Sequence, residues 1–316
     1  MRAQQASAAQ VGIIFAIAAY TMWGIAPIYF KQLTVLPAAE ILMHRIIWSV
    51  LVLVGLIAGL NQWPKVAAAF RNKKVMQVLL IAGILLGANW LLFIWAVNND
   101  HLLDASLGYY INPLINVFLG RLFLGERLRT FQRVAVVLAI VGVAILIFSY
   151  GHVPWIALIL AGSFSIYGIL RKQVAVDSLP GLFIETLMLS PLAIGYWLLF
   201  GSEYSNLFIN DASLNMLILA AGIVTTAPLL CFTAAARRIM YSTLGFLQYI
   251  GPTLMFVLAV YLYDEPLDEA RLITFGFVWL ALAVFSVDSL IAYKKQRKAL
   301  RASVQAAKAT SATQTS

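Results

Sequence analysis

Repeated runs of about twenty apolar residues limit what this chain can fold into more than any other feature. A transmembrane α-helix needs roughly 20 mostly apolar residues to cross the hydrocarbon core of a bilayer. The runs here are continuous, and short segments with charges, prolines or glycines separate them. A turn cluster at residues 150–154 divides the longest run. The sequence therefore predicts ten membrane-spanning helices, at about 11–30, 38–60, 75–97, 103–124, 131–149, 154–170, 181–200, 214–236, 242–263 and 272–293.

Composition excludes the other broad classes of protein. Hydrophobic residues make up 62% of the chain and charged residues 11%, whereas soluble domains carry roughly 25% charged residues. Transmembrane β-strands would alternate apolar and polar residues over roughly ten positions, and these runs are continuous and about twice as long. The single cysteine, Cys231, excludes a disulfide framework and a cysteine-based metal centre. An all-α integral membrane protein is the predicted fold class.

Positive charges follow the predicted topology. With ten spans both termini lie on one side, and a cytoplasmic N-terminus assigns eighteen of the 22 Lys and Arg residues to cytoplasmic segments. Only Lys31 and Arg271 fall outside, while Arg45 and Arg121 lie within spans. Cytoplasmic loops of membrane proteins carry such an excess. The net charge of +9 is therefore interpreted as a topology signal, not as nucleic-acid binding, in a multi-pass protein of the bacterial inner membrane with both termini cytoplasmic.

The two halves of the chain resemble each other at a spacing near 140 residues. The matched positions are 23–24 with 167–168, 105–109 (ASLGY) with 242–246 (STLGF), Pro113 with Pro252, and 125–128 (GERL) with 264–267 (DEPL). Because each half has five spans, an odd number, the second half enters the membrane from the opposite side. Inverted repeats of this kind are a recurring plan of secondary transporters.

This repeat divides the chain into four segments. They are a cytoplasmic N-terminus at 1–10, a first five-helix repeat at 11–149, an inverted second repeat at 150–293, and a basic cytoplasmic tail at 294–316 that is expected to be disordered. One chain holds both repeats, so the fold does not require an oligomer.

The block at 105–109, followed by 125–128 and a further apolar helix, resembles the EamA-type repeat of the drug/metabolite transporter superfamily, in two copies over about residues 10–293. Within that superfamily, three segments resemble the RarD permeases: 20–24 (YTMWG), 44–49 (HRIIWS) and 108–114 (GYYINPL). The resemblance implies a permease for metabolites or drugs, since RarD proteins are described as chloramphenicol-sensitivity proteins. The second copy departs from the pattern at 264–266, which we interpret as a loop variant.

Three ionisable residues lie within the second span. Ionisable groups inside membranes are costly and are functional candidates by default. Glu40 and His44 are four residues apart and share a helix face, and Arg45 lies 100° further around the helix. Arg45 is the candidate to line a central cavity and hold an anionic group. Glu40 and His44 are candidates for proton coupling, and the alternative is that they form a structural pair.

Polar and aromatic residues on other spans complete the candidate site. Tyr109, Asn112 and Asn116 form a polar stripe on the fourth span, and Pro113 is expected to break that helix. In the ninth span Gln248 and Tyr249 precede Pro252, the symmetric break. Trp90 and Tyr167 are candidates for aromatic walls of a substrate site. The alternatives are that the polar groups join helices and that the aromatic rings lie at the membrane interface.

These features favour a secondary transporter that moves a small organic solute through the lipid bilayer by alternating access, with proton coupling as the expected energy source. The sequence has no phosphate-binding loop, no metal-ligand cluster and no cofactor motif. Two alternatives stay open. A channel would more often need a charged ring around an oligomeric pore. An enzyme acting on a lipid-like substrate would need catalytic groups clustered at one depth.

Overall fold

The structure is a computed structural model that describes residues 2–124, 129–151, 153–236, 238–239, 247–288 and 291. Within these ranges the regular structure is helical, without strands. The elements are α1 (Arg2–Lys31), α2 (Ala38–Gly59), α3 (Trp63–Phe70), α4 (Lys73–Asn98), α5 (Leu102–Leu124), α6 (Thr130–Tyr150), α7 (Trp155–Gln173), α8 (Ser178–Phe200), η1 (Glu203–Ser205), α9 (Ala212–Ala236), α11 (Ile250–Tyr261) and a last helix, Glu269–Asp288. The predicted all-α fold class is confirmed.

Seven of the described helices are long and apolar enough to cross a membrane: Gln10–Lys31, Ala38–Gly59, Lys73–Asn98, Thr130–Ser149, Ser178–Phe200, Ala212–Phe232 and Glu269–Asp288. The chain is therefore a multi-pass membrane protein. The count of ten is matched only in part. The apolar stretch of α7, Trp155–Arg171, and all of α11 are shorter, and α5 is not among the seven. α11 begins at Ile250. Residues 240–246 and the tail at 294–316 lie outside the described part.

Two short helices and the start of α1 are not in the predicted topology. α3 occupies a segment that the charge pattern treats as a basic loop, and Pro64 lies at its start, where a missing N–H costs nothing. Its buried residues Val66 and Ala69 face the bundle, where α3 contacts α4 and α8. The 3-10 helix η1 lies between α8 and α9. α1 begins at Arg2, so the expected N-terminal segment 1–10 continues the first helix.

Local signals at helix ends agree with the structure. Asn72 caps α4, because its side-chain oxygen accepts the N–H of Val75 at 3.2 Å. Gly151 ends α6 in the left-handed conformation, at φ +69°. Pro154 then precedes α7. The turn cluster at 150–154 therefore separates two helices, as predicted.

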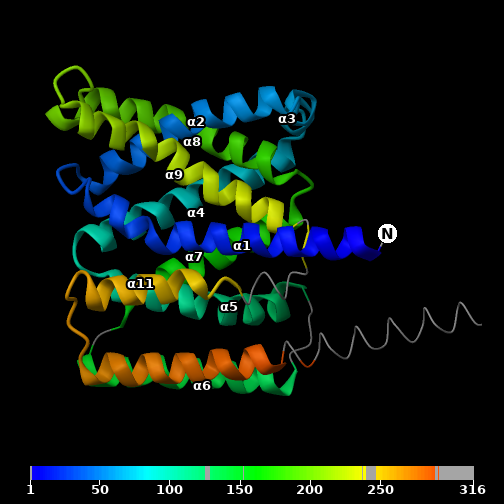
Figure 1. Cartoon of the computed structure of the whole chain (residues 1–316), viewed down its shortest axis with the longest axis vertical. Coiled ribbons are helices and arrows are strands. Elements are labelled where there is room, and N and C mark those ends of the chain that lie inside the picture. The colour runs from blue at the N-terminus through cyan, green and yellow to red at the C-terminus, as the bar shows by residue number, and fades with distance from the viewer. Residues whose placement is uncertain are drawn as a thin grey trace, which may run out of the picture.

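The helices lie side by side with roughly parallel axes (Figure 1). α2 and α8 form one edge of the stack, while α6 and the helix Glu269–Asp288 form the other. The links α1–α2, α4–α5 and α8–α9 lie at one end of the stack, and the N-terminus and α3 lie at the opposite end (Figure 1). Residues 65 and 71–74, which carry four basic side chains, are therefore on the same end as the N-terminus.

Neighbouring helices occur in related pairs. α1 contacts α9 and α11, and α7 correspondingly contacts α4 and α5. α2 contacts α9 while α8 contacts α4, and the pairs α2–α8 and α5–α11 are also in contact. If α1, α2, α4 and α5 are exchanged for α7, α8, α9 and α11, in that order, each of these contacts becomes a contact of the same set.

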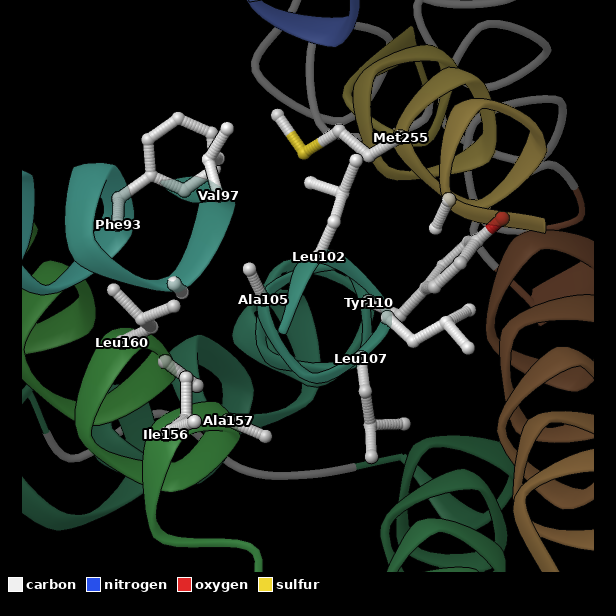
Figure 2. Close-up of a cluster of buried hydrophobic side chains, with 14 of the residues drawn as sticks. Phe93, Val97, Leu102, Ala105, Leu107, Tyr110, Ile156, Ala157, Leu160 and Met255 are labelled. Atoms are coloured by element: carbon white, nitrogen blue, oxygen red, sulfur yellow. The ribbon is translucent and has the colours of Figure 1, made fainter. Parts of the chain in front are cut away.

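The core is centred on α5 (Figure 2). Leu102, Ala105 and Leu107 point outward from this helix into neighbours that include Phe93 of α4 and Met255 of α11. α5 and α7 approach so closely that a Cβ at Gly108 would lie 2.8 Å from the main-chain oxygen of Ala157. A closely packed layer therefore lies between the α2–α8 edge and the α6 edge.

Candidate functional site

Arg45 is the charged residue at the centre of the site. Its side chain extends from α2, and the residue is only 6% exposed. The Nε atom donates to Thr225 Oγ1 of α9 at 2.8 Å. The guanidinium carbon lies 4.5 Å from the ring centroid of Trp90 on α4 and 5.1 Å from that of Phe30 on α1. Four helices therefore supply the surroundings of one cation, and the predicted neighbours Arg45 and Trp90 lie together.

No carboxylate neutralises Arg45 within the described residues: the ion pairs found there all involve other cations. The side chains of Tyr29 and Tyr109 also lie close enough to Arg45 to interact with its charge. A desolvated cation–π contact contributes on the order of 2 kcal/mol. Removing an ion from water costs several kcal/mol even after relaxation. The site therefore keeps an unbalanced positive charge inside the bundle.

Aromatic rings connect the Arg45 region to α7. Ring contacts follow the order Phe30, Phe93, Tyr109, Phe164 and Tyr167, with centroid distances of 6.0, 5.6, 6.3 and 5.9 Å. The predicted wall residue Tyr167 therefore lies at the α7 end of this aromatic row. Trp90 and Tyr167 both pack against one core cluster that includes Leu86 and Phe183. Three of the four contacts are edge-on or near it, the arrangement aromatic pairs prefer.

The polar stripe of α5 joins helices. Asn112 donates from Nδ2 to Ala161 O at 3.0 Å and to Ser165 Oγ at 2.9 Å, both on α7. Gln248 Nε2 donates to Asn112 Oδ1 at 3.2 Å, so these two predicted residues meet. Tyr109 makes a long contact of 3.4 Å with Asn89 Oδ1. Tyr109 and Asn112 thus face α4 and α7, and their polar groups are bonded between helices.

The remaining predicted residues of α5 and α11 differ in what surrounds them. α5 continues as a helix through position 113, and the side chains of Pro113 and Asn116 lie outside the described residues. Pro252 lies in the first turn of α11, where proline is tolerated, and its carbonyl accepts from Ser106 Oγ at 2.9 Å. The hydroxyl of Tyr249 is buried without a hydrogen-bond partner among the described residues.

Glu40 and His44 form a separate cluster with the link between α8 and α9. Glu40 accepts from Ser202 N at 3.0 Å, from Ser202 Oγ at 2.8 Å and from Ser205 Oγ. His44 Nε2 lies 3.2 Å from Ser205 Oγ, and its ring packs edge-on against Trp197 at 5.5 Å. Glu40 and His44 are 2% and 1% exposed. Ser205 therefore bridges the two candidates for proton coupling.

A buried ion pair lies at α7 and α8. Glu185 is 1% exposed, and its Oε1 lies 3.4 Å from Arg171 Nη1. Tyr167 OH donates to Glu185 Oε2 at 3.3 Å. A side chain at Gly181 would collide with the Arg171 guanidinium, so the glycine leaves the space that this pair occupies.

Sequence reasoning missed four residues that the structure brings to these clusters: Phe30, Thr225, Ser202 and Ser205. Thr225 and Thr226 are two adjacent polar residues in a mostly apolar helix, and this pattern could have directed attention to α9. Phe30 ends the first apolar run, and nothing in its position distinguishes it from a packing residue. Ser202 and Ser205 lie at the start and end of η1, between α8 and α9, and carry no motif.

Comparison with known proteins places the chain in a family. A model of the EamA-like transporter family matches residues 10–148. A protein named uncharacterized transporter from Vibrio cholerae is 53% identical over 293 residues, covering 92% of this chain and 97% of that protein. Protein RarD of Salmonella typhimurium is 51% identical over 288 residues, with coverage of 90% and 97%. The chain belongs to the RarD family of EamA-like transporters.

Membership of the RarD family confirms the resemblance to the RarD permeases, and the family model matches the segment of the first predicted repeat, at residues 10–148. It makes the chain a membrane transporter, so the function is transport and not catalysis. A solved crystal structure shares the fold with a TM-score of 0.59 at 19% identity, covering 90% of this chain and 98% of that one.

Proposed function

We propose that this member of the RarD family is a secondary transporter that moves a small organic solute across the bacterial inner membrane by alternating access. The observation that carries the proposal is the buried, unneutralised guanidinium of Arg45 where α1, α2, α4 and α9 meet. Substrate sites of such transporters lie near the midplane, where two repeats meet. The bond from Arg45 to Thr225 joins a helix of the first half to one of the second.

The repeats are proposed to be α1, α2, α4, α5 and α6 in residues 11–149, and α7, α8, α9, α11 and Glu269–Asp288 in residues 150–293. These ten helices would be the ten crossings. The exchangeable helix contacts support this division. A pair of glycines supports it further: a Cβ at Gly222 of α9 would lie 2.6 Å from the main-chain oxygen of Trp48 in α2, and one at Gly83 of α4 would lie 3.4 Å from that of Glu185 in α8. The two glycines are spaced near 140 residues apart, as the sequence motifs are.

The orientation proposed is with both termini in the cytoplasm. The end of the stack that holds the N-terminus and α3 also holds the basic segment at 65–74 (Figure 1). The opposite end holds Asp100, Glu203 and Asp211, in the links α4–α5 and α8–α9. Positive charge on the cytoplasmic side is the usual determinant of topology.

Proton coupling is assigned to Glu40 and His44. A carboxylate, a serine hydroxyl and an imidazole lie in one hydrogen-bonded line, with Ser205 in the middle. Nδ1 of His44 is buried without a hydrogen-bond partner among the described residues, so the imidazole has a nitrogen free to take up or release a proton. By the proposed orientation this line lies at the non-cytoplasmic end of α2.

Flux into proteoliposomes tests the proposal. The purified protein is reconstituted with an imposed pH gradient and offered a panel of amino acids, organic acids and amphipathic drugs. We expect gradient-stimulated uptake of one class, accelerated by the same solute preloaded inside, because a carrier returns faster when occupied. Arg45→Ala should abolish uptake, Glu40→Gln should abolish only the response to the gradient, and the exposed Arg133→Gln should change neither. Uptake that internal solute does not accelerate indicates a channel and contradicts the proposal.

A further inference from the structure

We propose that the transported solute is a monocarboxylate with an apolar, preferably aromatic, body, and that the guanidinium of Arg45 binds its carboxylate. This inference rests on the proposed function and specifies the ligand of the same site. It follows from three observations: the charge that the protein leaves unbalanced, the donors that it leaves unused, and the rings that surround them.

The ligand is expected to supply the negative charge, because the protein's own buried carboxylates are engaged elsewhere. Each of the four carboxylates buried in the described part of the chain has its own partners: Glu40 has Ser202 and Ser205, Glu185 has Arg171, Asp288 has Arg129, and Glu265 has two backbone N–H groups. Arg45 is the cation left over, and its Coulomb attraction for an anion is strong in these surroundings.

The unused donors match a carboxylate in number and geometry. A guanidinium carries five N–H groups. One, on Nε, is bonded to Thr225, and neither terminal nitrogen donates to a described residue. The two terminal nitrogens together form the fork that binds both oxygens of a carboxylate at once. Thr225 fixes the opposite edge of the guanidinium, so the fork is held in one orientation.

The rings indicate the rest of the ligand. Trp90 and Phe30 lie against the guanidinium, and Phe93 and Tyr109 continue the aromatic surface. Within the described residues, no second Lys or Arg contacts Trp90 or Phe30. One cation among rings suits one negative charge with an apolar body, and it offers a dianion or a hydrated inorganic ion few compensating donors.

Thermal unfolding of the whole protein in detergent tests the inference with matched probes. The probes are 3-phenylpropionate, its neutral amide, 2-phenylethylamine and phenylphosphonate, each titrated up to 10 mM. We expect 3-phenylpropionate to raise the unfolding temperature and the amide to bind about 10–100-fold more weakly, since it loses charge-assisted hydrogen bonds. This comparison needs no variant.

Variants assign the effect to Arg45. Arg45→Gln should weaken 3-phenylpropionate by about 10–100-fold, and Arg45→Lys should weaken it as well, because an ammonium keeps the charge but loses the fork. Arg133→Gln, which removes an exposed cation, should leave the affinity unchanged.

Three outcomes overturn the inference: equal stabilisation by the acid and the amide, stabilisation by the acid that survives Arg45→Gln, or no stabilisation by the acid. In each case accelerated exchange of a neutral or cationic solute in proteoliposomes leaves the transporter proposal intact, so the two failures can be told apart.

Discussion

Two buried clusters in this bundle differ in whether a buried charge has a partner of opposite charge. On α7 and α8, Glu185 faces Arg171 and accepts a bond from Tyr167. On α2, Arg45 faces rings and a hydroxyl, with no carboxylate among the described residues. A paired charge is part of the structure, because each partner reduces the cost of burying the other. Burying an unpaired charge costs more than its ring contacts contribute, and so its retention points to a ligand.

The largest expected effect comes from breaking the paired cluster. Glu185→Gln leaves the Arg171 cation largely buried without its counter-charge. Removing one partner of a buried ion pair typically costs about 3–5 kcal/mol. We therefore expect a strongly lowered unfolding temperature in detergent. The double variant Glu185→Gln with Arg171→Gln should recover part of the loss, and a single variant as stable as the unmodified protein would show that the pair is not structural.

Substitution of Arg45 in the unpaired cluster should reduce uptake without reducing stability. Arg45→Met removes a cation that has no carboxylate partner and leaves an apolar side chain among Phe30 and Trp90. We expect the unfolding temperature to stay the same or rise, while carboxylate uptake falls by about 10–100-fold. Paired measurements of stability and flux on one preparation check this. A loss of stability as large as that of Glu185→Gln would remove the distinction between the clusters.

Much of the bundle could be predicted because the bilayer sets helix length. The predicted span 38–60 differs by one residue from α2 (Ala38–Gly59), which begins directly after Pro37 and ends where the apolar run ends. α3 was missed because eight amphipathic residues are too short to register as a span. The predicted start of the ninth span, at 242, lies outside the described residues, and α11 itself begins at Ile250.

The sequence indicated candidate residues for the site but not which residues would lie beside them. Helical periodicity places Arg45 on a face of its helix, and it does not say which helix that face meets. Thr225, the partner of Arg45, lies 180 positions away. The same limit explains Asn112: the stripe was predicted, but only packing shows that it bonds α5 to α7. How the helices pack in three dimensions, and not local pattern, assembled the clusters.

The buried carboxylate of Glu265 sharpens the comparison, because backbone groups and not a cation hold it. Glu265 accepts the N–H groups of Leu102 and Leu103 at 2.7 and 2.8 Å, and so caps α5. Glu265→Gln keeps one acceptor and places an N–H₂ against the other donor. We expect a loss of about 1–2 kcal/mol at neutral pH, measured by thermal unfolding. The exposed Glu269→Gln removes the same charge and should have no effect.

Titration of Glu265 predicts the direction in which the stability of the protein changes with pH. Burial raises the pKa of the Glu265 carboxyl above its usual value, although the two N–H donors act in the opposite direction. The folded state therefore binds the proton more tightly than the unfolded chain. The free energy of unfolding should fall as pH rises from the usual carboxyl pKa through the raised one, and Glu265→Gln should remove this slope. An identical slope in the variant would contradict the assignment.

The smallest expected effect separates two adjacent hydroxyls on α9. Thr225 Oγ1 accepts from Arg45 Nε, whereas the buried hydroxyl of Thr226 has no hydrogen-bond partner among the described residues. Thr225→Val should weaken carboxylate binding by about 2–10-fold, because a hydrogen bond contributes about 0.5–1.5 kcal/mol and its loss lets the guanidinium rotate. Thr226→Val has the same size and depth but loses no bond, so binding should be unchanged. If both variants weaken binding equally, the fork is not held by Thr225. The orientation of the Arg45 guanidinium would then depend on its contacts with Trp90 and Phe30 alone.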